Sequence, residues 1–229
     1  MLLLEKIGMK RIGLLGCGSI GSQIAIAIDT GKIPAQLTHI YDVDKKKSEL
    51  LVSKLQQKPE IVENAHLLSS NPLDLVVEAA SQDAVNDNAL SILQNRKDLL
   101  IMSSGALLDE SVFEIISDAC KEFKKTVYLP SGAISGIDAL KSVKTELDSV
   151  VLTTTKHPNS LRGATFFENF KLNVDSYEEP STIFEGTASE AVRLFPKNVN
   201  VSALLSLVGL GSHETIVKIN VDPNTTKNT

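Results

Sequence analysis

Residues 10–21 read KRIGLLGCGSIG, an apolar run that passes directly into the glycine pattern G-x-G-x-x-G. This pattern is typical of dinucleotide-binding domains when it follows a strand and opens a helix. Residues 10–15 predict such a strand, and isoleucines spaced four apart predict a helix over 19–30. The stretch therefore predicts a strand–helix turn that binds an anionic ligand.

The three glycines of this turn have different expected tasks. Gly16 permits the tight turn, Gly18 lets the backbone approach a pyrophosphate, and Gly21 lets the helix pack closely on the strand. The N–H groups at the start of the helix, at Ser19 and Ile20, then bind the anion. A tight turn that carries no ligand is the alternative interpretation.

A second predicted strand, over residues 37–42, ends on Asp42, 21 residues beyond Gly21. A carboxylate at this place accepts hydrogen bonds from the adenosine ribose and repels a 2′-phosphate, so the sequence favours NAD. Basic residues follow at once, at positions 45–47. They are either a solvated helix start or a cluster that attracts the 2′-phosphate, which leaves use of NADP open.

The first 130 residues alternate short apolar runs with amphipathic stretches of helical length, in the order β-α-β-α-β-α-β-α-β. We therefore predict an α/β fold, with a doubly wound Rossmann domain in residues 1–130 and a smaller α+β domain for catalysis or dimerisation in residues 131–229. In the second domain, strands are expected at 150–155 and 215–221, and helices at 185–195 and 199–208.

Small residues follow two of the predicted central strands. Ala80 and Ser81 come after the apolar strand over 74–80, and a Ser-Ser-Gly string follows the next one at 103–105. Small side chains at the carboxyl ends of parallel strands leave room for a ligand, so we expect Ala80 and Ser81 to contact the cofactor. Helix capping explains the serines equally well.

Two further strings lie at or beyond the predicted domain boundary. Residues 130–138, PSGAISGID, carry glycines that let the backbone touch a flat nicotinamide ring, or that form a plain hinge. Residues 195–201, FPKNVNV, cluster Lys197, Asn198 and Asn200 in a turn between two helices. Asparagine suits the nicotinamide carboxamide. Lys197 and Asn198 are candidates for the substrate, although a surface lysine and a helix cap explain them too.

Composition excludes several classes of protein. A net charge of −5 with only 4% aromatic residues argues against a nucleic-acid partner. The apolar runs are far shorter than a membrane span. Two cysteines cannot form a disulfide framework, which indicates a reducing cytoplasm, and no histidine spacing suggests a bound metal.

Taken together, the strings GCGSIG, PSGAISGID, FEGTASEAVRLFPKNVNVSA and KINVDPN resemble the L-aspartate dehydrogenase family over residues 10–229. The resemblance implies a homodimeric NAD(P)-dependent enzyme that oxidises L-aspartate to iminosuccinate. That product can feed quinolinate and NAD synthesis, or hydrolyse to oxaloacetate and ammonia, so enzymes of the quinolinate pathway are candidate partners. By motif, Ala133 and Asn200 match cofactor-contacting positions of the family.

The resemblance also implies a catalytic histidine that follows the VDP strand end in an N-x-H string. This sequence stops at Asn228-Thr229, so the histidine is expected as the residue after Thr229, and we expect a longer natural protein with no catalytic residue in 1–229. Two other readings stay open. One is another two-domain reductase, such as homoserine dehydrogenase or dihydrodipicolinate reductase, and the other is a non-catalytic NAD-binding protein.

Overall fold

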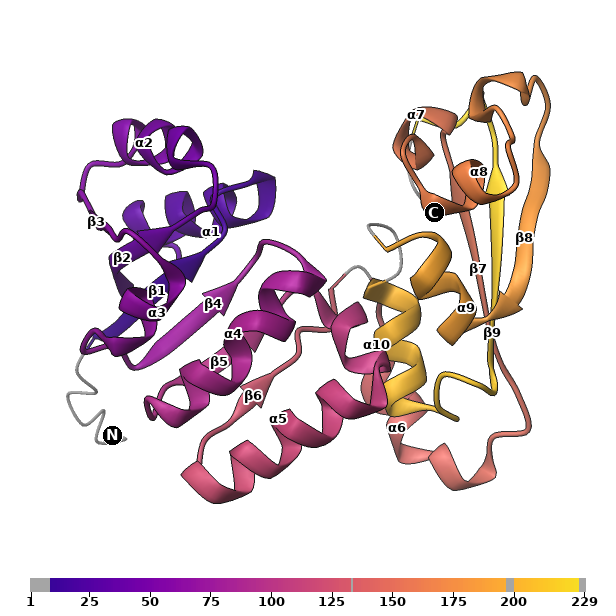
Figure 1. The fold of residues 1–229 in the computed structure, drawn as a ribbon. Helices are drawn as coiled ribbons and strands as arrows, with labels where there is room; N and C mark the ends of the chain where they lie inside the picture. Colours follow the sequence, from indigo (N-terminus) through magenta and orange to yellow (C-terminus); the bar gives the residue numbers. More distant parts are fainter. Residues whose placement is uncertain (1–8, 133, 197–199, 227–229) are drawn as a thin grey trace, which may run out of the picture. The chain divides into compact units, whose positions relative to one another are not determined.

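The computed structural model describes residues 9–132, 134–196 and 200–226, and Figure 1 shows its fold. The chain separates into two compact units. Unit 1 comprises residues 1–106 and 111–130, and unit 2 comprises residues 107–110 and 131–229. Each unit contains its own sheet and its own apolar core.

Unit 1 is built on a six-stranded parallel sheet with the order β3-β2-β1-β4-β5-β6. The order reverses between β1 and β4, as in dinucleotide-binding folds, so the predicted doubly wound α/β fold is confirmed. The strands are β1 (Lys10–Leu15), β2 (Ala35–Tyr41), β3 (Glu60–Ile61), β4 (Leu75–Glu78), β5 (Asp98–Ile101) and β6 (Val127–Tyr128).

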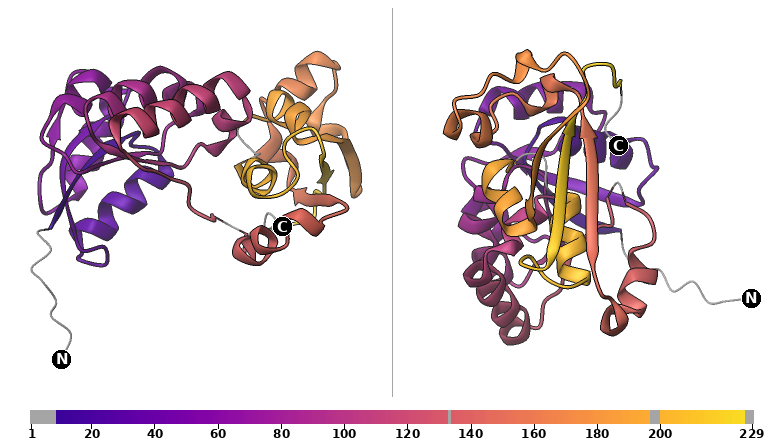
Figure 2. Two further views of the ribbon diagram at one scale, coloured as in Figure 1. Left: turned by 90° about the horizontal axis from the view of Figure 1, so that it is seen from below. Right: turned by 90° about the vertical axis from the view of Figure 1, so that its right-hand side faces the viewer.

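Helices lie on both faces of this sheet. Figure 2 shows α1 on one face and α4 and α5 on the opposite face. Apolar side chains of β1 and β2, including the fully buried Leu14 and Ile40, pack against α1 and α2 to form a core. The helices are α1 (Ser19–Asp29), α2 (Lys45–Lys54), α3 (Ala65–Ser70), α4 (Gln82–Gln94) and α5 (Glu110–Phe123), with a 3-10 turn η1 at Ser104–Leu108.

Two details of unit 1 differ from the sequence-based expectation. β3 and α3 were not predicted, because two and six residues are too few to show a period. The buried face of α1 consists of Gly21, Ala25 and Ile28, whereas Ile20 is 47% exposed. The small residues bring the helix close to the sheet and turn Ile20 outward.

Unit 2 carries a three-stranded sheet in the order β7-β9-β8, in which β7 is parallel and β8 antiparallel to β9. Its core packs alternate residues of β9 against helices, with the rings of Phe166 and Phe195 stacked 5.0 Å apart. None of the described helices is long and apolar enough to cross a membrane. The strands are β7 (Val150–Lys156), β8 (Ser181–Thr187) and β9 (Thr215–Val221), and the helices are α6 (Ile137–Ser142), α7 (Pro158–Leu161), α8 (Thr165–Asn169), α9 (Ala188–Leu194) and α10 (Asn200–Val208), with 3-10 turns η2 (Lys144–Glu146) and η3 (Val174–Ser176).

The predicted helix over 185–195 is wrong at its start, because residues 185–187 belong to β8. A capping box at Thr187 and Glu190 explains the boundary. The Thr187 hydroxyl accepts the Glu190 N–H at 3.2 Å, and the Glu190 carboxylate accepts the Thr187 N–H at 2.8 Å. The string T-x-x-E is the sequence signal for this start of α9.

Candidate functional site

The predicted glycine turn joins β1 to α1 at the carboxyl edge of the unit 1 sheet. Gly16 has a φ of +102°, which side-chain-bearing residues rarely adopt. A Cβ on Gly16 would lie 2.7 Å from the backbone of Ala79 and Ala80, and a Cβ on Gly21 would overlap the carbonyl oxygen of Gly16. Close approach of backbone to backbone therefore requires glycine at both places.

Gly18 differs from the other two glycines. It is the N-cap of α1, and a Cβ placed on it would meet no atom within 4 Å. Ser19 and Ile20, the first residues of the helix, are exposed beside it. Because the first N–H groups of a helix have no partner within the helix, this open side of Gly18 fits an anion such as a pyrophosphate.

Asp42 lies directly after β2 and holds the glycine turn in place. One oxygen of its carboxylate accepts the N–H of Cys17 at 2.7 Å, and the other accepts the N–H of Asp44 at 2.8 Å. Each carboxylate oxygen can accept a second hydrogen bond. The pair of backbone donors therefore orients Asp42 and leaves it able to bind a ribose hydroxyl.

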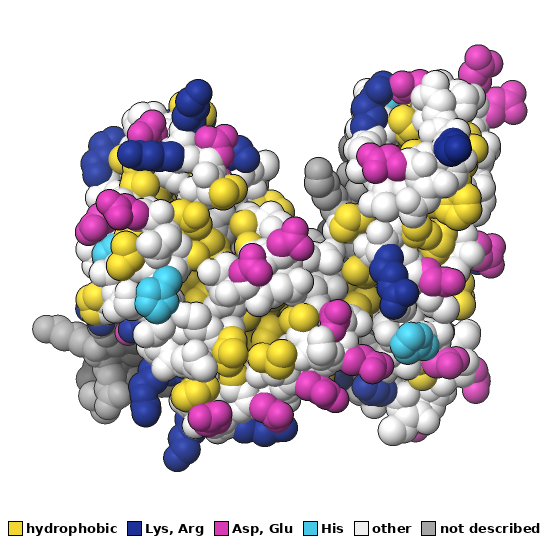
Figure 3. All heavy atoms as spheres, in the orientation of Figure 1, with side chains coloured by type: hydrophobic (Ala, Val, Ile, Leu, Met, Phe, Trp, Pro, Cys, Tyr) yellow, Lys and Arg dark blue, Asp and Glu magenta, His cyan; other side chains and the backbone are white. Residues whose placement is uncertain are grey.

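A pocket of about 530 Å³ opens beside Asp42. Its charged lining is mixed, with carboxylates from Asp42 and Glu63 and an ammonium group from Lys45. Lys and Arg side chains gather over α2, the helix that begins at Lys45, on the face drawn in Figure 3. The other lining residues are apolar or aromatic, which suits an adenine ring: Tyr41, Val43, Ile61 and Val62.

Cys17 is buried within the glycine turn, at 5% exposure. Its thiol lies 3.5 Å from the hydroxyl of Ser48, and burial raises the pKa of the Cys17 thiol above its ordinary value. A raised pKa disfavours the reactive thiolate. The structure therefore favours a role for Cys17 as a small packing residue of the turn.

Ala80 and Ser81 follow β4 and are exposed at the same edge of the sheet, next to Gly16. The Ser81 hydroxyl accepts the N–H of Ala84 at 3.2 Å and caps α4, so the capping interpretation holds for this serine. Contact of Ala80 and Ser81 with a cofactor stays a prediction.

Glu78, the last residue of β4, is a buried carboxylate that the sequence reasoning missed. It is 1% exposed and accepts the N–H of Ala80 at 2.7 Å, the N–H of Ser103 at 3.0 Å and the hydroxyl of Ser103 at 2.8 Å. Burial raises the pKa of Glu78 in spite of these donors. Glu78 thereby ties the loops after β4 and β5 together. A lone acid in the apolar string LVVEAA was its only sequence signal.

Of the site residues expected in the second half of the chain, only Asn200 lies among the described residues. Ala133, Lys197 and Asn198 lie outside the described residues, as does the histidine expected after Thr229, which stays a prediction. Asn200 is the exposed first residue of α10. Within the described ranges, no three metal-ligating side chains come together.

Comparison with known families divides the chain at the same region as the fold does. Residues 16–130 match the family described as the NAD-binding domain of homoserine dehydrogenase. Residues 138–229 match the family described as the C-terminal part of aspartate dehydrogenase. The two matches cover both units.

Individual relatives agree with the C-terminal match. L-aspartate dehydrogenase of Nitrosopumilus maritimus is 64% identical over 221 residues, which span 96% of this chain and 81% of the relative. The enzyme of that name from Methanocella arvoryzae is 44% identical over the same shares of both chains. The crystal structure of aspartate dehydrogenase from Thermotoga maritima superposes with a TM-score of 0.73 at 28% identity, over 96% of this chain and 82% of that one. The resemblance drawn from the sequence is confirmed: the chain belongs to the L-aspartate dehydrogenase family.

Proposed function

We propose that this chain oxidises L-aspartate to iminosuccinate with a nicotinamide dinucleotide as the hydride acceptor. The observation that carries the proposal is the geometry of unit 1, where Gly18 leaves open space at the start of α1 and Asp42 faces a pocket. The match of residues 138–229 to the C-terminal part of aspartate dehydrogenase supplies the substrate class.

The residues of unit 1 bind and orient the dinucleotide in this proposal. The N-terminus of α1 and the backbone at Gly18 hold the pyrophosphate, and Asp42 accepts a hydrogen bond from the adenosine ribose. When bound, the dinucleotide would supply the acceptor for the hydride on Cα of the amino acid, whose nitrogen must first lose its proton.

NAD is the preferred cofactor in the proposal, and NADP remains usable. Two carboxylates, Asp42 and Glu63, and one ammonium group, Lys45, line the pocket, so a 2′-phosphate meets a net negative surface there. Lys45 also lies 4.0 Å from Glu49 across one turn of α2, and both side chains are largely exposed. Such a surface pair is weak, so Lys45 can still move towards a phosphate.

The test is reduction of NAD or NADP by the purified chain, followed by the absorbance of the reduced nicotinamide. L-aspartate should support reduction, at a rate roughly 10²–10⁴-fold lower if the general acid/base is the histidine expected after Thr229, whereas D-aspartate and L-homoserine should not. L-homoserine is the informative control because residues 16–130 match a homoserine dehydrogenase domain. Activity with homoserine alone would favour the alternative interpretation as another two-domain reductase, such as homoserine dehydrogenase. Tight NADH binding without turnover of either amino acid would favour a non-catalytic NAD-binding protein.

Two finer expectations accompany the proposal. Homodimer formation is testable by analytical ultracentrifugation of the purified chain. A role in quinolinate and NAD synthesis is testable by coupling iminosuccinate formation to a quinolinate-forming enzyme. Both rest on family resemblance.

A further inference from the structure

Lys156, the last residue of β7, is a lysine buried on the core side of the unit 2 sheet. Only 8% of its surface is exposed. It pairs in register with Val221 at the end of β9, as Leu152 pairs with Val217. Side chains alternate between the faces of a strand, so Lys156 shares the face of Val217 and Val221, which belong to the apolar core.

The Lys156 ammonium group has no counter-charge within the described residues. No hydrogen bond or ion pair to its Nζ is present there, and no charged group influences its pKa, which burial alone lowers. Among the described residues, Thr215 Oγ1 is the only side-chain nitrogen or oxygen that is both fully buried and without a hydrogen-bond partner. Since Lys156 Nζ also has no partner there, it must keep some exposure to solvent. Lys156 is therefore an unpaired cation that solvent and small ligands can still reach.

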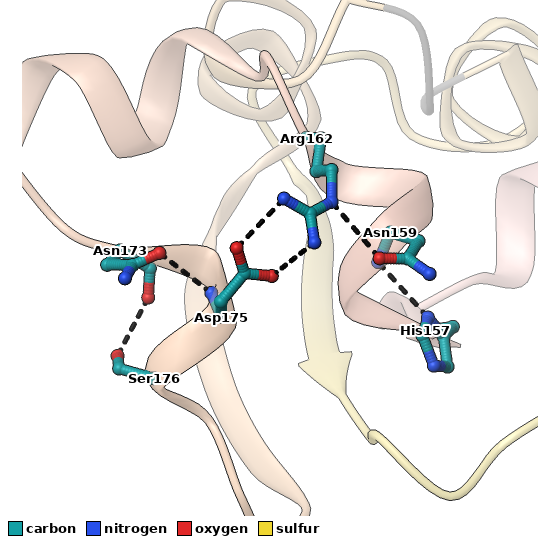
Figure 4. A network of polar contacts seen from close by, with 6 residues as sticks. All are labelled: His157, Asn159, Arg162, Asn173, Asp175 and Ser176. Carbon is teal, nitrogen blue, oxygen red and sulfur yellow. Dashed lines mark hydrogen bonds and ion pairs between the residues drawn. The ribbon is translucent and has the colours of Figure 1, made fainter.

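Two basic side chains that follow Lys156 closely in the sequence, His157 and Arg162, are already engaged, as Figure 4 shows. Arg162 makes a two-pronged ion pair with Asp175, at 2.8 Å and 2.6 Å. His157 caps α7, because its Nδ1 accepts the N–H of Asn159 at 3.1 Å. The charge of Arg162 is therefore neutralised by Asp175, and the Nδ1 lone pair of His157 is used by the helix cap.

Burying an ammonium group among apolar side chains costs free energy unless an anion neutralises it. Asp222 does not do so: its backbone N–H donates to the Lys156 carbonyl at 2.9 Å, while its carboxylate accepts the N–H of Asn224 at 2.8 Å. An anion from outside the described chain would offset this cost. If the proposed function holds, the substrate brings two carboxylates.

We propose that Lys156 binds a carboxylate of the amino-acid substrate at the carboxyl ends of β7 and β9. This inference rests on the proposed function for the identity of the ligand, but not for the presence of an anion site. A lysine that merely fills space in the core is the rival interpretation, and it makes the opposite prediction for stability.

The first experiment replaces Lys156 by Met, which keeps the length of the side chain and removes its charge, and by Arg, which keeps the charge. Lys218→Met is the matched control, since Lys218 lies on β9 and is paired at 2.8 Å with Glu185 on the sheet. Steady-state kinetics with L-aspartate, NADH titration and thermal unfolding are measured for all four proteins.

Lys156→Met should raise KM for L-aspartate roughly 10- to 100-fold, the loss expected for a hydrogen bond between charged groups. NADH affinity should stay within about twofold, and the melting temperature should stay equal or rise because an unpaired buried charge has gone. Lys156→Arg should recover part of the lost affinity, and Lys218→Met should match the parent chain. An unchanged KM would overturn the proposal. If the melting temperature also fell, the result would favour a lysine that only fills space in the core.

The second experiment uses succinate, a dicarboxylate that cannot react, and therefore does not depend on turnover. Succinate should raise the melting temperature of the NADH complex, and Lys156→Met should abolish that rise while Lys218→Met keeps it. If the parent chain fails to oxidise aspartate yet shows this Lys156-dependent response, the proposed function fails and the anion site stands. If the chain oxidises aspartate and Lys156→Met responds to succinate as the parent does, the anion site fails and the function stands. No response of the parent chain to succinate would also overturn the anion site.

Discussion

The glycine turn of unit 1 and the end of β7 in unit 2 show two different ways of preparing a binding site. At the turn, the carboxylate of Asp42 is already held by two backbone N–H groups, and Gly16 is packed against the backbone after β4. At the end of β7, Lys156 is nearly as buried as the core but has no partner among the described residues. The carboxylate at the glycine turn is already hydrogen-bonded in the absence of a ligand. In our proposal, the ammonium group of Lys156 gains its partner only when a ligand binds.

The difference has a physical reason. A dinucleotide presents a pyrophosphate, which backbone N–H groups can bind in a fixed geometry at little cost in side-chain entropy. A small carboxylate offers fewer oxygens to such donors, and an unpaired ammonium group such as that of Lys156 attracts it by charge. Changes at the turn should therefore act through shape, whereas changes at Lys156 should act through charge.

The largest expected effect comes from Gly18→Val. Because a Cβ on Gly18 would meet no protein atom, the cost to folding is that of replacing a glycine N-cap by valine, about 1 kcal/mol or less in the free energy of unfolding. Cofactor binding should nevertheless be lost, since the branched side chain occupies the place of the pyrophosphate. NADH fluorescence titration together with urea unfolding checks both parts. Normal NADH binding by a folded Gly18→Val variant would remove the turn from the cofactor site.

Gly21→Ala should weaken the same cofactor site by destabilising the fold of the turn, not by blocking the ligand. Its methyl group would overlap the carbonyl oxygen of Gly16, so the helix must shift away from the strand. We expect a loss of roughly 1–3 kcal/mol in the free energy of unfolding, as for other overpacked positions, and weaker NADH binding as a consequence. A variant as stable as the parent would show that α1 can move at no cost, and the turn would then not be preorganised.

Asp42→Asn should separate the two tasks of this carboxylate. An amide offers one oxygen in place of two, so one of the N–H groups of Cys17 and Asp44 loses its acceptor. NAD affinity should fall by about 1–3 kcal/mol, the cost of leaving polar partners unpaired, and NADP affinity should fall less because charge repulsion is relieved. Asp44→Asn is the matched control. The Asp44 carboxylate caps α2 by accepting the N–H of Lys46 at 3.1 Å, and asparagine caps a helix as well as aspartate does. Equal losses for both cofactors in calorimetric titration would mean that Asp42 acts only on the turn.

What the sequence predicts well is what depends on neighbours along the chain. The glycine turn, Asp42 and the strand over 215–221 follow from spacing and alternation, and the structure has each of them in place. The errors arose where local preference and tertiary pairing disagree. Residues 185–187 fit a helix by their neighbours, but they pair with β9 as part of β8.

Glu78 and Lys156 could not be found from the sequence for a different reason. Each is one charged residue in a strand, and a charge there is ordinarily read as an outward-facing position. Only the fold shows that Glu78 is surrounded by hydrogen-bond donors, and that Lys156 is largely buried with no partner among the described residues. Burial and pairing are properties of the packed molecule, so a pattern of residue types does not predict them.

The smallest expected effect concerns Glu78 and the pH dependence of stability. Burial raises the pKa of Glu78, so the folded chain holds this proton more tightly than the unfolded chain does. Between the ordinary pKa of a glutamate and the raised value, the folded state binds more protons, and its free energy of unfolding must fall as pH rises. Glu78→Gln cannot ionise and lacks this contribution. Urea unfolding across a pH series should therefore show the parent losing stability relative to Glu78→Gln as pH rises through that window.

Asp74 provides the control of opposite sign for this measurement. It is partly exposed, and the backbone N–H of Arg11, at 2.7 Å, holds the pKa of Asp74 below its ordinary value. The stability that it contributes is present above the ordinary aspartate pKa and is lost as pH falls through the lowered value. The free energy of unfolding of Asp74→Asn should therefore approach that of the parent as pH falls. The free energy of unfolding of Glu78→Gln should instead rise relative to that of the parent as pH rises towards neutral. If both variants respond in the same direction, Glu78 is not held as a buried acid, and the link between the loops after β4 and β5 rests on something other than its carboxyl group.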